Sequence, residues 1–259
     1  MKTVFINCSP KKHFCASAYF IFLQRLFVGG KKVTEKLRTP ADHDRILVQL
    51  DDAQNVVFSL PLYVDGVPSH VLRFMEKMET YCKEKDLKLS VYCLANNGFI
   101  EGRQNEPLMQ IFENLCNRAG LNWGGGIGVG GGVMLNVYRI VYVVQFCFLL
   151  LNIILNAINT GSFYDKGALT VFRNDTAIIL FLNLGVLFYI ARMGHFIRKS
   201  TFSGKKYTRI MVPSFLFILF ADLFFIIVSL IKGGLFRGWL AKKQPTCNQT
   251  SLIEGEVQI

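Results

Sequence analysis

The sequence predicts a parallel α/β domain followed by a membrane region of three helices. Strand-like and helix-like segments alternate from residue 3 to residue 129, and three long apolar runs follow them. Such alternation over about 130 residues favours a parallel sheet covered by helices on both faces. Each later run is long enough to cross a bilayer, which takes roughly 20 apolar residues.

The α/β domain is expected to occupy residues 1–132. Pro61 ends one strand, Pro68 begins a helix and Gly120 ends another, which helps to set the boundaries. The expected strands are 3–7, 32–37, 55–60, 87–95 and 121–129. The expected helices between them are 15–28, 42–52, 68–85 and 104–119.

Residues 133–259 are expected to form the membrane region, with spans at about 137–158, 176–197 and 210–231 and a short C-terminal tail. The alternative is three core helices of a soluble protein. Such helices need polar outer faces, which these segments lack. The sequence therefore favours a multi-pass membrane protein.

Charge supports a bilayer as partner and sets an orientation. Residues 1–135 carry 16 Lys/Arg and 13 Asp/Glu, and residues 136–259 carry 13 and 5, so most of the net charge of +11 accompanies the apolar half. The soluble half has no basic stripe with interleaved aromatics, which argues against nucleic acid.

The segment 198–209 is read as a basic loop, and basic loops stay in the cytoplasm. We therefore expect the protein in the cell membrane, with the N-terminal domain cytoplasmic and the C-terminus outside. The basic residues of this segment are Arg198, Lys199, Lys205, Lys206 and Arg209.

Neither cysteines nor histidines predict a metal site. The seven cysteines form no C-x-x-C pair, which argues against a disulfide framework, an iron–sulfur cluster and zinc. His13, His43, His70 and His195 do not cluster in sequence, so no metal is expected.

Three loops that follow predicted strands point to a mononucleotide site, because ligands of open parallel sheets bind beyond the carboxyl ends of the strands. The loop after the first strand offers hydroxyls, a lysine and a helix start, which suit a phosphate. The loop after the third strand is apolar and aromatic, which suits a flat ring, and the loop after the fourth offers amides. The candidate cofactor-binding residues are Ser9, Lys11, Ser17, Pro61, Leu62, Tyr63, Val64, Asn96, Asn97 and Gly98.

Two of these loops resemble motifs of the flavodoxin-like NAD(P)H-dependent FMN reductase family. Residues 8–17 (CSPKKHFCAS) resemble the phosphate motif G-S-P-R-K-x-G-N-[ST], with Phe14, Cys15 and Ala16 in place of G-N-[ST] and Ser17 one position later. Residues 60–68 (LPLYVDGVP) resemble the ring-binding motif [ST]-P-[VIL]-Y-x-x-x-[VIM]-[PS]. The resemblance implies a doubly wound five-stranded sheet of order 2-1-3-4-5, FMN at its carboxyl edge, and often a homodimer. The apolar half resembles a membrane extension of some bacterial relatives.

The resemblance implies an oxidoreductase that moves a hydride from NAD(P)H to flavin N5 and then to an acceptor, with a quinone or a protein as candidates. The flavin carries that chemistry, so no residue is expected to act as acid, base or nucleophile. Glu101 could contact the flavin or stay solvated. One alternative is a non-enzymatic membrane protein whose flavodoxin-like domain senses redox state or binds a partner. A small transporter is disfavoured by three spans with few charges.

The glycine run at 123–132 (WGGGIGVGGG) contains G-x-G-x-x-G but is not expected to bind a dinucleotide. It follows the last strand instead of the first, and Leu151 stands where the ribose-binding acid would be. We expect the glycines to admit a close backbone approach and to form a hinge at 130–132. The first span or a partner is then expected to cover one sheet face. In the apolar half, Asp222 is a candidate for a functional or a helix-packing role.

Overall fold

The computed structural model describes residues 1–11 and 15–231. The C-terminal tail, with Cys247, lies outside these residues, as does His13. In chain order the elements are β1 (Lys2–Asn7), α1 (Ala16–Phe27), β2 (Lys31–Lys36), η1 (Pro40–Asp42), α2 (His43–Val48), β3 (Asn55–Pro61), α3 (Ser69–Glu84), β4 (Ser90–Asn96), η2 (Gly102–Asn105), α4 (Glu106–Ala119), β5 (Asn122–Gly130), α5 (Gly132–Thr160), α6 (Lys166–Leu182), α7 (Leu184–Lys199), β6 (Lys205–Arg209) and α8 (Ser214–Ile231).

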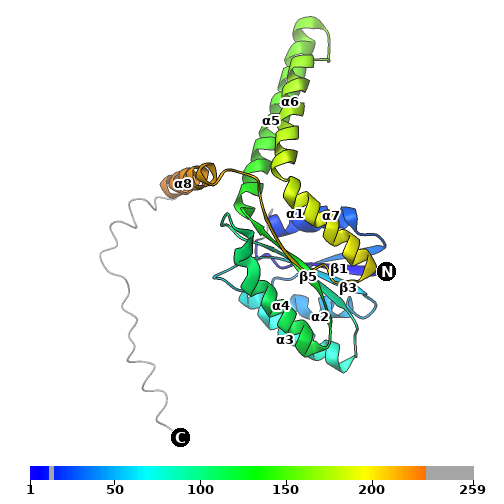
Figure 1. Cartoon of the computed structure of the whole chain (residues 1–259). Coiled ribbons are helices and arrows are strands. Elements are labelled where there is room, and N and C mark those ends of the chain that lie inside the picture. Colours follow the sequence, from blue (N-terminus) through cyan, green and yellow to red (C-terminus); the bar gives the residue numbers. More distant parts are fainter. Residues whose placement is uncertain (12–14, 232–259) are drawn as a thin grey trace, which may run out of the picture. The chain divides into compact units, whose positions relative to one another are not determined.

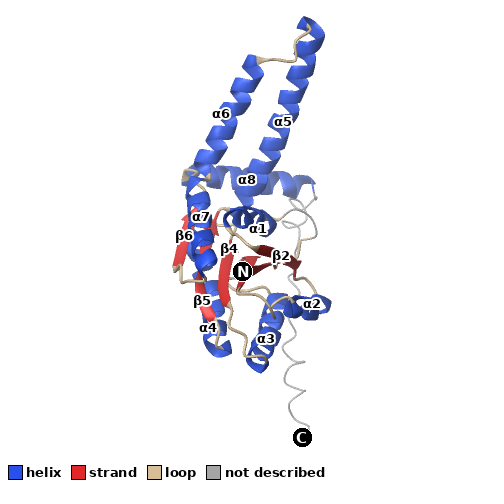
Figure 2. Ribbon diagram, turned by 90° about the vertical axis from the view of Figure 1, so that its right-hand side faces the viewer, coloured by secondary structure: helices blue, strands red, loops and turns tan. Residues whose placement is uncertain are grey.

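The sheet is parallel throughout, with the order β2-β1-β3-β4-β5-β6. Figure 2 shows its strands in red, with β6 beside β5. The predicted parallel sheet is confirmed, but the predicted number of five strands is wrong. The sixth strand pairs with β5 from Lys205 opposite Gly126 to Arg209 opposite Gly130. Its sequence, KKYTR, has no apolar run and therefore looks like a basic loop. Short, charged strands are typical of sheet edges, where they discourage pairing with other chains.

Helices cover both faces of the sheet (Figure 1). Helices α2, α3 and α4 lie on one face, where their apolar side chains join those of β1, β3 and β4 in the main hydrophobic core. Helices α1 and α7 pack against each other and against the sheet on the other face. This arrangement is a doubly wound α/β fold in which the last covering helix is α7.

The predicted second span, 176–197, is not one straight helix. It is divided at Asn183 between α6 and α7, which meet at 61°. The α7 part is buried against the sheet domain through Val186, Ile190, Met193 and Ile197. The main chain of α7 also accepts a hydrogen bond from the buried side chain of Asn55, whose Nδ2 lies 3.1 Å from Ile197 O.

The spacing of these four residues is that of an amphipathic helix, with one apolar stripe facing the core. The exposed side of α7 is also partly apolar, because Leu184 is 55% and Phe188 is 59% exposed. Hydropathy therefore runs on from α6 into α7 without a break. This explains why the sequence favours a membrane span in a segment that packs on the sheet.

The structure also corrects the expectation that the first span or a partner covers one face of the sheet. Helix α5 begins directly after β5, but it runs away from the sheet beside α6, and α7 supplies the cover (Figure 1). The pair α5–α6 is called the hairpin below. It is held by contact between the tilted rings of Tyr142 and Phe172, with centroids 5.4 Å apart, and by a 2.9 Å hydrogen bond from Gln145 Nε2 to Asp175 Oδ2.

Two described helices are long and apolar enough to cross a membrane, Tyr138–Thr160 within α5 and Ser214–Ile231, with mean hydropathies of 2.2 and 2.7. The number rises to three if the bent pair α6–α7 counts as one span. Residues Met1–Met211 form one compact unit, and α8 belongs to a second unit that starts at Val212. The division into a cofactor domain at 1–132 and a membrane region at 133–259 stays a prediction.

The glycines of β5 admit the segment that leads into η2. A Cβ on Gly128 would lie 2.6 Å from Gly102 O, and one on Gly130 would lie 2.7 Å from Gly102 N. Any side chain at these positions would push that segment off the strand. The close backbone approach expected from the sequence is therefore present in the structure.

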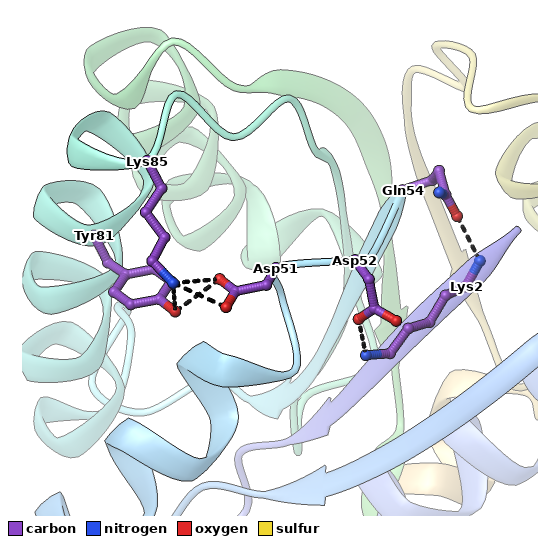
Figure 3. A network of polar contacts seen from close by, with 6 residues as sticks. All are labelled: Lys2, Asp51, Asp52, Gln54, Tyr81 and Lys85. Atoms are coloured by element: carbon purple, nitrogen blue, oxygen red, sulfur yellow. Dashed lines mark hydrogen bonds and ion pairs between the residues drawn. The ribbon is translucent and has the colours of Figure 1, made fainter.

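A polar network joins elements at the amino edge of the sheet (Figure 3). Lys2, the first residue of β1, pairs with Asp52. The neighbouring Asp51 accepts hydrogen bonds from Tyr81 (2.7 Å) and Lys85 (2.8 Å) at the end of α3. These contacts tie the loop before β3 to β1 and α3. The candidate site lies at the opposite, carboxyl edge.

Candidate functional site

The loops after β1, β3 and β4 meet at the carboxyl edge of the sheet. The strand order reverses at β1, which has β2 on one side and β3 on the other. Ligands of doubly wound sheets bind at such a switch point. A cleft of about 160 Å³ lies there.

The cleft brings together nine of the ten residues that the sequence singles out. The exception is Val64, which is fully exposed and does not line it. The nine are Ser9, Lys11, Ser17, Pro61, Leu62, Tyr63, Asn96, Asn97 and Gly98.

Part of the cleft lining is suited to an anion. Ser9 and Lys11 come from the loop after β1, and Ser17 lies in the first turn of α1. Ser9 is held by a 3.1 Å hydrogen bond from its backbone N–H to Asn7 Oδ1. Cys15, at the N-cap of α1, makes no side-chain capping hydrogen bond. The N–H groups of the first turn point toward this end of α1, where the helix dipole favours a negative ligand.

Two asparagines at the end of β4 form the other polar part of the cleft. Asn96 Nδ2 donates to Leu60 O at 3.0 Å and to Ser17 Oγ at 3.4 Å, which links the end of β4 to β3 and to the first turn of α1. Asn97 Nδ2 donates to Glu101 O at 2.9 Å. Asn97 Oδ1 is buried and has no partner among the described residues. Because an unpaired buried acceptor costs about 1–3 kcal/mol, this atom is suited to accept from a ligand.

The loop after β3 forms the apolar wall. It leaves the strand at Pro61 and turns back on itself, with Tyr63 N–H donating to Gly66 O at 3.1 Å. The two residues between them, Val64 and Asp65, have φ of 45° and 55°. Positive φ is costly for a β-branched residue such as valine and recurs at binding sites. Tyr63 is 42% exposed at the mouth of the cleft.

Three lining residues are not among the sequence predictions: Cys15, Ala16 and Gly132. Cys15 and Ala16 lie inside the altered phosphate motif, at positions where this chain differs from the family pattern, so the pattern does not assign them to the site. Gly132 ends the glycine run, and its N–H donates to Asn97 O at 2.8 Å. A Cβ there would lie 3.0 Å from Asn96 Oδ1 and from Asn97 O. The position of a glycine just after the glycine-rich strand β5 is the signal that points to it.

The other candidates lie away from the cleft. Glu101 is exposed, and its main-chain oxygen accepts a hydrogen bond from Asn97 Nδ2. His43 packs against Phe74, and His70 Nε2 lies 3.0 Å from Cys8 O. Asp222 is exposed on α8. Within residues 1–11 and 15–231, no three His, Cys, Asp or Glu side chains are grouped to hold a metal.

Solved structures resemble about half of this chain. The Trp repressor binding protein of Bacillus subtilis is 17% identical, with a TM-score of 0.42, over 50% of this chain and 84% of its own. An NADPH-quinone reductase of P. pentosaceus is 15% identical, with a TM-score of 0.44, over 51% and 86%. An FMN-dependent NADH-azoreductase of Bacillus anthracis, solved with FMN, is 14% identical, with a TM-score of 0.37, over 51% and 88%.

No protein-family profile and no curated protein sequence matches the chain. Identities below 25% and TM-scores below 0.5 say nothing of what this chain binds. The chemistry of the cleft therefore has to be argued from its own residues.

Proposed function

We propose that this chain is an FMN-dependent NAD(P)H oxidoreductase attached to a membrane through its hairpin and α8. The observation that carries the proposal is the convergence of three loops on one cleft at the switch point of the sheet. Lys11 and the start of α1 line this cleft together with Pro61–Tyr63 and Asn96–Gly98.

The described residues fit FMN. Lys11, the hydroxyls of Ser9 and Ser17 and the first N–H groups of α1 would hold the phosphate. The backbone of Pro61, Leu62 and Tyr63 would lie along the ring, and the unpaired Oδ1 of Asn97 would accept a hydrogen bond from a ring N–H. When bound, the flavin supplies two-electron transfer between NAD(P)H and an acceptor.

The cleft encloses about 160 Å³, which is less than the roughly 300–1,000 Å³ of typical small-molecule sites. The described residues therefore surround only part of the cofactor. The remaining face would be open to NAD(P)H. The protein's part is to bind and orient the two molecules.

Membrane attachment is supported by the apolar, exposed surfaces of α5 and α8, which offer lengths of 23 and 18 residues. At about 1.5 Å per residue these lengths correspond to roughly 35 Å and 27 Å, and both fall within the range of about 17–25 residues that transmembrane helices use. A cytoplasmic position of the sheet domain is part of the proposal, because NAD(P)H is a cytosolic reductant.

The proposal is tested by titrating FMN into detergent-purified, flavin-stripped protein and following flavin fluorescence. Lys11→Ala should weaken binding by about 10-fold or more, since a charge-assisted hydrogen bond contributes about 1.5–3 kcal/mol. Ser17→Ala should weaken it less. Lys88→Ala is the matched control, because Lys88 pairs with Asp86 away from the cleft and should bind FMN like the parent.

If the parent does not bind FMN, or binds it as well in Lys11→Ala as in Lys88→Ala at low salt, the cleft is not a flavin site. The alternative of a non-enzymatic membrane protein with a partner-binding domain would then be favoured.

A further inference from the structure

The two helices that cover one face of the sheet turn large apolar side chains outward. On α1, Phe22 and Leu26 lie one turn apart and are 60% and 64% exposed. On α7, Leu184 and Phe188 have the same spacing and are exposed to a similar extent. The inner sides of both helices pack on each other and on the sheet. The outer surface of α1 and α7, with these four side chains, is called the α1–α7 face below.

The apolar parts of the two helices lie next to each other. Gln24 of α1 bonds to Ile190 O of α7, and further along both helices Phe27 lies against Gly194. The helices therefore run side by side in the same direction. Each carries an exposed phenylalanine of the face two residues before the first of these contacts, so the two phenylalanines lie at the same level. Contiguous apolar surface of this kind marks a site of interaction.

The α1–α7 face is also basic. Neither α1 nor α7 contains an Asp or Glu residue. Arg25 lies in the last turn of α1, and Arg192, Arg198 and Lys199 lie in the second half of α7. The helices on the opposite face differ, because α2, α3 and α4 contain one, three and two acidic residues. Large apolar side chains beside cations, without carboxylates, are typical of helices that lie on anionic lipid.

The α1–α7 face also continues the surface of the hairpin. Helix α6 passes into α7 at the 61° bend, and α1 lies at the root of the hairpin, where Tyr19 lines one cavity with Tyr138, the first residue of the apolar span of α5. The hairpin leaves the sheet domain on the side of α1 and α7, opposite α2, α3 and α4 (Figure 1). Figure 2 shows α1 between the hairpin and the strands. A bilayer around the hairpin would therefore meet this face of the sheet domain.

We propose that the α1–α7 face lies on the surface of the bilayer, with its four apolar side chains among the lipid headgroups and its cations beside anionic ones. The inference rests on the proposed membrane attachment and adds to it a contact made by the sheet domain itself. A second copy of this chain would suit the face less well. In a symmetric pair the same patch meets itself, which would bring the cations together without carboxylates to neutralise them.

The test uses the full chain with Cys147→Ser and Cys247→Ser, reconstituted into vesicles of phosphatidylcholine and phosphatidylglycerol. The five remaining cysteines are buried, so one added cysteine carries the fluorophore NBD. Phe22→Cys places it on the α1–α7 face. Val48→Cys is the matched control, because Val48 lies on α2 and is 59% exposed on the opposite face. Nitroxides on lipid headgroups should quench the fluorophore at position 22 at least about twofold and leave that at position 48 unchanged.

The role of the cations is tested in the same vesicles. Each cation near an anionic surface changes membrane affinity by about fivefold, so Arg198→Gln with Lys199→Gln should reduce quenching at position 22. Omitting phosphatidylglycerol should reduce it as well. Lys77→Gln with Lys83→Gln is the matched control, since it removes two exposed lysines from α3 on the opposite face and should leave quenching as in the parent.

A fluorophore at Ile154→Cys, within the apolar span of α5, reports insertion of the hairpin through nitroxides on the acyl chains. Quenching at position 154 with equal quenching at positions 22 and 48 would overturn the inference and leave the membrane attachment in place. A fluorophore at position 22 that is shielded from water but not quenched by lipid would assign the face to a second copy and overturn it too. The absence of quenching at position 154 would contradict the attachment and the inference together.

Flavin binding separates the inference from the rest of the proposed function. If position 22 is quenched as expected but the parent binds no FMN, the α1–α7 face is assigned correctly and the oxidoreductase fails. If FMN binds and position 154 is quenched but position 22 is not, the function stands and the inference fails. Circular dichroism of each labelled variant checks that it is folded.

Discussion

The side chain of Gln24 on α1 donates a hydrogen bond to the carbonyl oxygen of Ile190 on α7, at 3.1 Å and with Gln24 fully buried. The two residues are 166 positions apart, and the whole hairpin lies between them in sequence. The hairpin is therefore an insertion between β5 and the helix that covers the same side of the sheet as α1. Both ends of the hairpin are connected to the sheet domain, one through β5 and the other through α7.

Close packing of α1 on α7 predicts that Gly194→Ala is destabilising. An added Cβ would lie 2.5 Å from Phe27 Cβ and 2.8 Å from Phe27 O. Overpacking costs typically 1–3 kcal/mol, which exceeds the roughly 1 kcal/mol that alanine gains in helix propensity. Thermal melts followed by circular dichroism should show a lower Tm for Gly194→Ala. Gly185→Ala in the same helix, where among the described residues only Thr208 Oγ1 approaches at 3.1 Å, should melt no lower than the parent.

The attachment of β6 predicts a pH-dependent stability. Tyr207 OH donates to Glu106 Oε2 at 2.7 Å, and this hydrogen bond, with nearby Lys205, holds the pKa of Glu106 below its usual value. A carboxyl whose folded pKa is lowered stabilises the fold above its unfolded pKa of about 4.3. That contribution is lost as the pH falls through the lower folded pKa.

Tyr207→Phe should therefore cost about 0.5–1 kcal/mol of unfolding free energy at pH 7, allowing for the partial exposure of Glu106. The difference from the parent should shrink below about pH 4. Urea unfolding at pH 7 and at pH 3.5 measures both values. A difference that is the same at the two pH values would contradict the role of the charged carboxylate.

Membrane crossing by the hairpin predicts that its tip and the sheet domain lie on opposite sides of a bilayer. In a chain with Cys147→Ser and Cys247→Ser, the five remaining cysteines are buried. Burial also raises the pKa of the Cys82 thiol to about 11, so it stays unreactive at pH 7. A cysteine placed at Ser162 in the hairpin tip should react with an impermeant maleimide from one side of sealed vesicles.

A cysteine placed at Lys88 in the sheet domain should react only from the other side. Labelling of both positions from the same side would mean that the hairpin does not cross. Both cysteines should be labelled once detergent has dissolved the vesicles, and this is the control for their accessibility.

Strain at Val64 predicts that Val64→Gly stabilises the fold. The left-handed conformation costs a residue with a Cβ about 1–2 kcal/mol, part of which the extra freedom of unfolded glycine offsets. The variant should gain about 0.5–1 kcal/mol in urea unfolding. Because Val64 does not line the cleft, FMN affinity should stay within about twofold of the parent. A marked loss of affinity would mean that Val64 contacts the cofactor, as the sequence predicts.

Local patterns explain which parts of this structure were predictable. Strands β1, β3 and β4 are buried apolar runs, and the residues that follow them meet in the cleft because parallel strands end at one edge. The strand β6 has no apolar pattern, and its pairing depends on the glycines of β5. It could not be found without tertiary structure.

Helix α7 shows the limit of hydropathy. Its buried stripe and its apolar exposed side make one continuous run with α6, and only the bend at Asn183 separates them. A cavity between α1, α5 and α6 depends on that bend, since Asn183 lines it.

The most direct test of the account is the visible spectrum of the detergent-purified protein, recorded without oxygen before and after addition of NADPH. We expect a flavin band, present as purified or after addition of FMN, that bleaches when NADPH is added. A protein that shows no retained flavin band even after FMN is added, or a band that NADPH leaves unchanged while dithionite bleaches it, would contradict an NAD(P)H oxidoreductase.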